Sequence, residues 1–167
     1  MRRILFVCTG NTCRSPMAMS IFNHLADREL SGLGYEAASA GLSVPVEEPP
    51  STNAILAIKS RLGTDISGHR AHSLSEAEAE AAYLILTMTR SHKNAILSMY
   101  PKMHQKVYTL KEYAYGLSDG HMHSGSRKAP FNADVADPFG GSPKSYMLCA
   151  EEIEDAVKKL VEKLKKG

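Results

Sequence analysis

Stretches with the pattern of buried strands alternate with stretches of helical periodicity along most of the 167 residues, and this alternation constrains the fold more than any single motif. Residues 3–8 open the series with an apolar, β-rich run, which is typical of a parallel strand covered on both faces. Ser15 and Pro16 then predict a helix start, because Pro suits the first helical position, where no N–H donor is needed. Further strands are predicted over residues 35–40, 83–88 and 106–110, and further helices over 51–62, from Ser75 onward, over 91–99 and over 142–165.

The order of these elements predicts an α/β fold: a doubly wound, four-stranded parallel sheet with helices on both faces. In such sheets ligands bind beyond the carboxyl ends of the strands, where the strand order reverses. We expect a single domain over residues 1–167, because a chain of this length that is 43% hydrophobic supplies one sizeable core. Residues 116–130 have no periodicity and are rich in Gly, Ser and His, so they predict a flexible insertion at the surface.

Two of the predicted helices carry specific local patterns. Ser75 and Glu78 have the spacing of a capping box, in which the two side chains satisfy free N–H groups at a helix start. The periodicity of the last helix predicts a buried face made of Leu148, Ile153, Ala156, Val157, Leu160, Val161 and Leu164.

Composition excludes several classes of protein. The formal charge of +2 comes with no basic arm or acidic tail, so we expect no nucleic-acid partner. No apolar run is long enough to span a membrane, and the one behind Arg2 and Arg3 is too short for a signal peptide. The 3 cysteines do not suggest a disulfide framework. We therefore expect a cytoplasmic monomer with reduced thiols.

The loop after the first predicted strand has the composition of a phosphate site. A loop that folds back at a helix N-terminus directs several backbone N–H groups at one point, and such a nest binds a phosphate dianion. Gly10 permits close approach of the backbone, and Asn11 tolerates the left-handed conformation. Arg14 can donate two parallel hydrogen bonds to phosphate oxygens, which lysine cannot do. The predicted phosphate-binding loop comprises Thr9, Gly10, Asn11, Thr12, Cys13, Arg14 and Ser15.

Cys8, at the end of the predicted strand, is expected to lie beneath this loop. The loop N–H groups and Arg14 would stabilise its thiolate, which makes it a nucleophile at neutral pH, and Ser15 can donate a hydrogen bond to it. A phosphate held in line with a thiolate predicts phosphoryl transfer to cysteine.

Hydrolysis also needs an acid for the leaving group and a base for the attacking water. Asp134 and Asp137 are the two candidates in the polar stretch before the last helix. We favour Asp137, because Pro138 fixes the turn that follows it and Phe139 supplies a ring for a pocket wall.

With these residues in place, the chain resembles the low-molecular-weight protein tyrosine phosphatases from end to end. The nucleophile loop and the later Asp137-Pro138 loop occur in the order typical of that family. Within the family, the sequence is similar to the bacterial protein-arginine phosphatases in its phosphate loop, in Ser39-Ala40-Gly41, in Leu110-Lys111-Glu112-Tyr113 and in Asp137-Pro138-Phe139-Gly140-Gly141.

The resemblance implies a mechanism and a supporting network. It implies a cysteinyl-phosphate intermediate on Cys8, no metal or other cofactor, and Asp137 acting first as acid and then as base. It also implies phosphorylated proteins as substrates. Around the loop, it implies a bracing network of Asn11, Ser15, Ser39 and His69.

Two positions bear on the substrate. In the tyrosine branch of the family, the position of Thr12 usually holds a bulky aliphatic residue and that of Phe139 usually a tyrosine. A threonine hydroxyl can meet the polar edge of a guanidinium group. The sequence therefore favours phosphoarginine in proteins as the substrate, with phosphotyrosine, cleaved by the same mechanism, as the alternative.

Two further classes of protein, and a metal site, fit the sequence less well. A thiol-coupled arsenate reductase has a similar loop but needs a further cysteine pair, and the only cysteine outside the loop is Cys149. A phosphoprotein-binding module without activity would be expected to lack one of the catalytic residues. His121 and His123 lie close together, but no carboxylate or cysteine stands at ligand spacing, so we expect no metal site.

Cys13 is either a small buried hydrophobe or the partner of Cys8 in a reversible disulfide.

Overall fold

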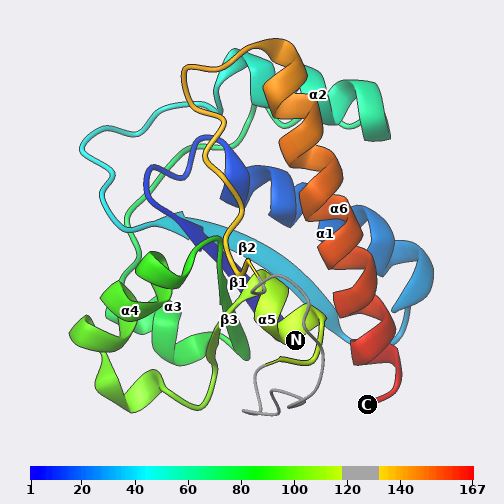
Figure 1. The fold of residues 1–167 in the computed structure, drawn as a ribbon. Coiled ribbons are helices and arrows are strands. Elements are labelled where there is room, and N and C mark those ends of the chain that lie inside the picture. Colours follow the sequence, from blue (N-terminus) through cyan, green and yellow to red (C-terminus); the bar gives the residue numbers. More distant parts are fainter. Residues whose placement is uncertain (118–131) are drawn as a thin grey trace, which may run out of the picture.

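A four-stranded parallel sheet forms the centre of the computed structural model, which describes residues 1–117 and 132–167 (Figure 1). The strand order is β2-β1-β3-β4. Their bounds are β1 Arg2–Cys8, β2 Tyr35–Gly41, β3 Leu84–Thr87 and β4 Val107–Thr109. The chain moves outward from β1 to β2 and then returns to the other side of β1, so the strand order reverses between β1 and β3. The predicted parallel α/β sheet is confirmed, and the loop after β1 lies at its switch point.

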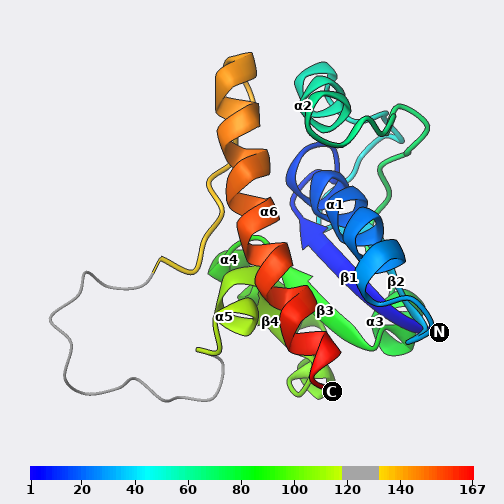
Figure 2. The ribbon, with the colours of Figure 1, turned by 90° about the vertical axis from the view of Figure 1, so that its right-hand side faces the viewer.

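Helices cover both faces of this sheet, as the sequence predicted. They are α1 Arg14–Glu29, α2 Thr52–Leu62, α3 Glu76–Ala81, α4 Arg90–Met99, α5 Leu110–Ala114 and α6 Pro143–Lys165. In Figure 1, α3 and α4 lie to the left of the sheet and α1 and α6 to its right. Figures 1 and 2 both show α6 running beside α1, in agreement with the many contacts between these two helices.

Alternate residues of the central strands supply two hydrophobic cores. Ile4 and Phe6 of β1 face the core under α1, α2, α5 and α6, and the ring of Phe6 lies 6.0 Å from that of Phe22, centroid to centroid. Leu5 and Val7 face the core under α3 and α4. Because β1 is buried on both faces, the end of this strand is a rigid base for the loop that follows it.

Two local expectations met different outcomes in the helices. The capping box at Ser75 is present: its hydroxyl accepts from the backbone N–H of Glu78, and the Glu78 carboxylate accepts from the Ser75 backbone. The placement of Leu148 on the buried face of α6 was wrong, since this side chain is 56% exposed and the neighbouring Cys149 is buried. The other predicted apolar residues of that face are buried.

Helix α5 was not predicted. The apolar pattern indicated a strand over residues 106–110, but β4 ends at Thr109 and the helix begins at Leu110. Thr109 and Glu112 form a capping box that starts α5 directly at the strand end. Threonine followed three residues later by glutamate was the signal in the sequence.

Some expectations cannot be compared with the structure. Of the predicted insertion over residues 116–130, all but the first two residues lie outside the described residues, as do His121 and His123. Within the described parts of the chain, no helix is long and apolar enough to cross a membrane.

The packing predicts a contrast between two large apolar side chains. Phe22→Ala should lower the free energy of unfolding by about 3–5 kcal/mol, because Phe22 is fully buried between α1 and the sheet. Leu148→Ala should change it by no more than about 0.5 kcal/mol, because this side chain is mostly exposed. Urea unfolding of both variants measures the difference; equal losses would contradict the assignment of the buried faces.

Candidate active site

The loop between β1 and α1 takes its shape from Asn11. This residue is fully buried and has a φ of 56°, the left-handed conformation that the sequence analysis expected it to tolerate. Its side-chain amide donates to the Ser15 hydroxyl at 2.8 Å and to the Ser39 hydroxyl at 3.0 Å, and its side-chain oxygen accepts from the His72 backbone N–H at 3.2 Å. These three bonds hold the turn from inside the protein.

The backbone of the loop is anchored on its outer side. The carbonyl of Thr9 accepts from the N–H groups of Leu42 and Ser43, and the carbonyl of Thr12 accepts from that of Ser51. By contrast, the backbone N–H groups of residues 10–13 donate to no acceptor among the described residues. The N–H groups are therefore free to bind an anion, while the carbonyls of Thr9 and Thr12 are already occupied.

Gly41 and Gly10 differ in whether the surrounding protein leaves room for a side chain. A Cβ on Gly41 would lie 2.7 Å from the Thr9 carbonyl and 2.5 Å from the Val44 side chain, so only glycine lets β2 end this close to the loop. A Cβ on Gly10 would meet only the Thr12 hydroxyl, at 3.7 Å, which is ordinary contact. The packing of the protein therefore demands Gly41, whereas the space at Gly10 is available to a ligand.

Cys8 lies at the base of the loop, where β1 ends. The residue is 3% exposed, and its sulfur is 2.9 Å from the hydroxyl of Ser15, itself fully buried in the first turn of α1. The Ser15 hydroxyl accepts from Asn11, and its own proton is available to donate to the sulfur. This arrangement suits a thiolate, which accepts a hydrogen bond.

Arg14 is buried beside Cys8, with one part of its guanidinium unpaired. One terminal nitrogen donates to the Val135 carbonyl at 2.9 Å, and the other lies 3.4 Å from a carboxylate oxygen of Asp137. The Nε atom is buried with no hydrogen-bond partner among the described residues. A buried donor without an acceptor is costly, and a phosphate oxygen in the cavity would supply one.

A cavity of about 290 Å³ lies over the loop. Its lining includes Cys8, Thr12 and Arg14 from the loop and Asp137 and Phe139 from the segment before α6. The opposite wall comes from the segment after β2 and comprises Ser43, Val44, Pro45, Val46 and Glu48. This second wall was not predicted from the sequence, because its residues form no motif with the loop.

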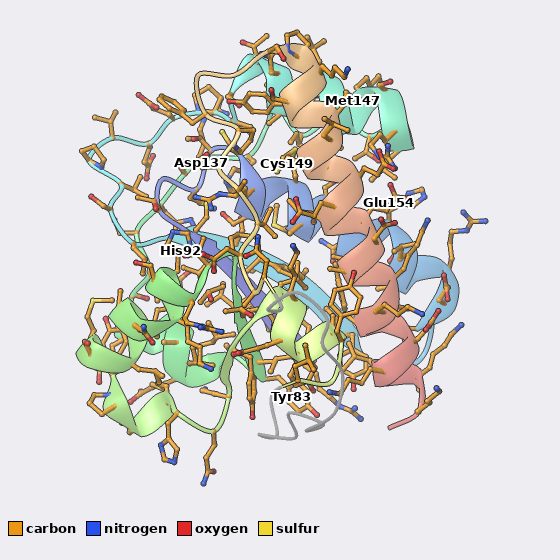
Figure 3. All side chains as sticks on the ribbon, in the orientation of Figure 1. Tyr83, His92, Asp137, Met147, Cys149 and Glu154 are labelled. Atoms are coloured by element: carbon orange, nitrogen blue, oxygen red, sulfur yellow. The ribbon has the colours of Figure 1, made fainter. Side chains whose placement is uncertain are left out.

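Asp137 reaches the cavity because its segment is fixed to the sheet. The N–H of Val135 donates to the Met88 carbonyl at 2.8 Å, just after β3. Figure 3 shows Asp137 on the chain leading into α6, near the start of α1. The other acidic candidate, Asp134, accepts from the backbone N–H of Arg90 at 2.8 Å and does not line the cavity.

The remaining residues expected around the loop also lie close to it. His69 is half-buried, and its Nε2 lies 3.2 Å from the Asn11 carbonyl, to which it donates. Burial lowers the pKa of His69, so its ring is neutral at neutral pH. Cys13 is buried, with its sulfur 3.3 Å from the Ser51 hydroxyl and 3.4 Å from the Tyr146 hydroxyl. All three cysteines are free thiols, and a Cys8–Cys13 disulfide stays a prediction.

His92 is a buried residue of the site that sequence reasoning missed. Its Nε2 lies 2.8 Å from the Thr9 hydroxyl, and its Nδ1 is buried without a partner among the described residues. Burial, reinforced by the charge of Arg14, lowers the pKa of His92 to about 4. The ring is therefore neutral at neutral pH. It comes from α4, far from the loop in sequence, and no spacing in the sequence indicated the contact.

Comparisons with known proteins identify the family to which this chain belongs. The family model described as low molecular weight phosphotyrosine protein phosphatase matches residues 3–167. A protein-arginine-phosphatase of Bacillus subtilis (strain 168) is 37% identical over 98% of this chain and 97% of its own length. The chain therefore belongs to the low molecular weight phosphotyrosine protein phosphatase family.

Two solved structures show the same fold. A low molecular weight protein tyrosine phosphatase from T. tengcongensis is 41% identical with a TM-score of 0.81, covering 98% of this chain and 99% of its own. A cysteine-to-serine mutant of the YwlE arginine phosphatase, with a phosphorylated active-site serine, is 36% identical with a TM-score of 0.83, covering 98% and 96%.

The lowered pKa of His92 predicts that acid weakens the fold. An unfolded histidine titrates near pH 6.5, so the stabilisation by the neutral, buried ring is complete above that pH and is lost as the pH falls towards 4. Between pH 7 and pH 5 this loss should reach about 1–2 kcal/mol, with His69 adding to it in the same direction. His92→Gln should remove most of the His92 contribution, whereas the exposed His104→Gln should not. Urea unfolding at both pH values measures the free energy of unfolding. A His92→Gln variant that loses as much of this free energy between pH 7 and pH 5 as the wild type would contradict the prediction.

Proposed function

We propose that this protein is a protein phosphatase that hydrolyses phosphoarginine in proteins through a cysteinyl-phosphate intermediate. The observation that carries the phosphatase chemistry is the convergence of Cys8, Arg14 and Asp137 on one cavity, with the Nε of Arg14 left unpaired. This chemistry requires a thiolate, a guanidinium that binds the phosphate and a proton donor, and these three residues supply them in that order.

In the first step, the phosphate occupies the loop and receives hydrogen bonds from the backbone N–H groups and from Arg14. The Cys8 thiolate attacks phosphorus, and the bond from phosphorus to the leaving nitrogen breaks. Asp137 gives its proton to that nitrogen, so arginine leaves with its guanidinium intact. The product on the enzyme is a phosphate ester of the Cys8 sulfur.

In the second step, water replaces the departed arginine. Asp137, now ionised, takes a proton from this water, which attacks phosphorus in line with the sulfur. The sulfur–phosphorus bond breaks, and inorganic phosphate and the Cys8 thiolate are released. The hydroxyl of Ser15, 2.9 Å from the sulfur, stabilises the thiolate as it leaves.

The walls of the cavity support phosphoarginine over phosphotyrosine. Thr12, in the phosphate loop, lines the cavity and offers a hydroxyl to the N–H groups of a guanidinium. Phe139 lines the mouth and can stack on the planar guanidinium face. The similarity to the protein-arginine-phosphatase of Bacillus subtilis supports the same choice. Phosphotyrosine, hydrolysed by the same residues, is the second candidate, supported by the similarity to the T. tengcongensis enzyme.

Arsenate reduction has less support. Such a reaction would use a second reactive cysteine to carry oxidation away from Cys8. Cys149, on α6, is buried, and burial raises the pKa of its thiol to about 12. A thiol this weakly acidic is not a nucleophile at neutral pH.

Removing the sulfur should separate binding from chemistry. Cys8→Ser should bind inorganic phosphate with an affinity close to that of the wild type, because the loop and Arg14 remain, and should lose at least about 1,000-fold in kcat, because a serine hydroxyl is not ionised. Phosphate titration and steady-state kinetics measure the two effects. Turnover within tenfold of the wild type would show that Cys8 is not the nucleophile, and loss of turnover with no anion binding would point to a misfolded loop.

Substrate choice is tested at Thr12. On peptides of matched sequence carrying phosphoarginine or phosphotyrosine, the wild type should have the higher kcat/KM for phosphoarginine. Thr12→Ile should shift the ratio of the two values towards phosphotyrosine by at least about tenfold, because it removes the hydroxyl that meets the guanidinium edge. Faster turnover of phosphotyrosine by the wild type would assign the protein to phosphotyrosine, with the mechanism unchanged.

A further inference from the structure

Glu48 is an acidic residue in the wall of the catalytic cavity with no role in the mechanism above. It lines the cavity on the side formed by the segment after β2, whereas Asp137 and Phe139 come from the segment before α6. Its carboxylate makes no ion pair or hydrogen bond with any described residue. Its backbone is nevertheless fixed, because its carbonyl accepts from the N–H of Ala71 at 2.8 Å.

The charges of the cavity are arranged in two layers. The floor is positive, with the free N–H groups of the loop, the N-terminus of α1 and the Arg14 guanidinium. The described residues that line the cavity include two acidic residues, Asp137 and Glu48, and no cationic residue other than Arg14. A ligand complementary to this cavity therefore carries negative charge at its tip and positive charge directly behind it.

Phosphoarginine has this order of charges and phosphotyrosine does not. Its phosphoryl group is an anion, and the guanidinium that carries it keeps a delocalised positive charge. The phosphoryl group of phosphotyrosine is carried by a neutral ring. In the proposed reaction Asp137 carries a proton in the first step and is neutral while it does so, which leaves Glu48 as the ionised group in the wall.

The surroundings of Glu48 would strengthen such an attraction. Val44, Pro45 and Val46 give the same wall an apolar surface, and Phe139 also lines the cavity. A substrate side chain held between these residues excludes water from the space between its guanidinium and the carboxylate. Charges separated by less water interact more strongly.

We propose that Glu48 is a specificity-determining residue whose carboxylate receives the guanidinium cation of phosphoarginine. This inference rests on the proposed function, since it concerns the same substrate in the same cavity. Glu48 takes no part in bond breaking. It stabilises the bound substrate, so its effect belongs in KM more than in kcat.

The experiment compares Glu48→Gln with a matched control. Glu47→Gln removes the same charge one residue away, from an exposed side chain that does not line the cavity. The two variants and the wild type are assayed on matched phosphoarginine and phosphotyrosine peptides at low and at moderate ionic strength. Unfolding midpoints of all three proteins are measured beside the kinetics to exclude a change in stability.

We expect the phosphoarginine-to-phosphotyrosine ratio of kcat/KM to fall about 5- to 20-fold in Glu48→Gln, mainly through KM, and to stay within about twofold in Glu47→Gln. Added salt should lower the ratio in the wild type more than in Glu48→Gln, because screening and charge removal act on the same attraction.

The outcomes separate this inference from the proposed function. A wild type that prefers phosphoarginine, with a ratio unchanged in Glu48→Gln or equally lowered in Glu47→Gln, would overturn the role of Glu48 and leave the proposed function standing. A wild type that prefers phosphotyrosine would overturn both.

Discussion

The conformation of Asn11 is the constraint on which the rest of the site depends. A left-handed φ at a residue other than glycine costs on the order of 1–2 kcal/mol, and here it is held by side-chain bonds to Ser15, Ser39 and the backbone of His72. These partners belong to α1, β2 and the segment after α2, so the turn is tied to three parts of the fold. That turn keeps the N–H groups of residues 10–13 away from acceptors in the described parts of the protein, so they can bind an anion.

The pair of Arg14 and Asp137 links the loop to the segment before α6. Arg14 is almost fully buried, and a buried charge needs partners, which the Val135 carbonyl and the Asp137 carboxylate provide. In the proposed cycle a bound phosphate competes with Asp137 for the same guanidinium. The carboxylate that loses its partner is then close to the leaving group, where the proton is required. One ion pair thus holds the site in a conformation close to the reactive one.

The sequence predicted those parts of the structure that depend on local sequence patterns. The buried β1 strand, the loop that follows it and the capping box at Ser75 depend on residues that are neighbours in the chain. Helix α5 was missed because an apolar run continued across the strand end, and Leu148 was misplaced because a wide apolar stripe does not show where the buried face of a helix stops. His92 and Glu48 were missed for a different reason. They reach the site only through the packing of α4 and of the segment after β2, and no spacing records such contacts.

The charges of the cavity also bear on how products leave. In the proposed reaction the departing arginine takes its positive charge with it, and the second step restores Asp137 to a protonated state. The inorganic phosphate that remains is then held by Arg14 and the loop but faces Glu48 with no cation between them. Like charges in one partly enclosed site weaken binding. The same carboxylate that favours the zwitterionic substrate thus disfavours its anionic product, so one wall residue would serve both entry and release.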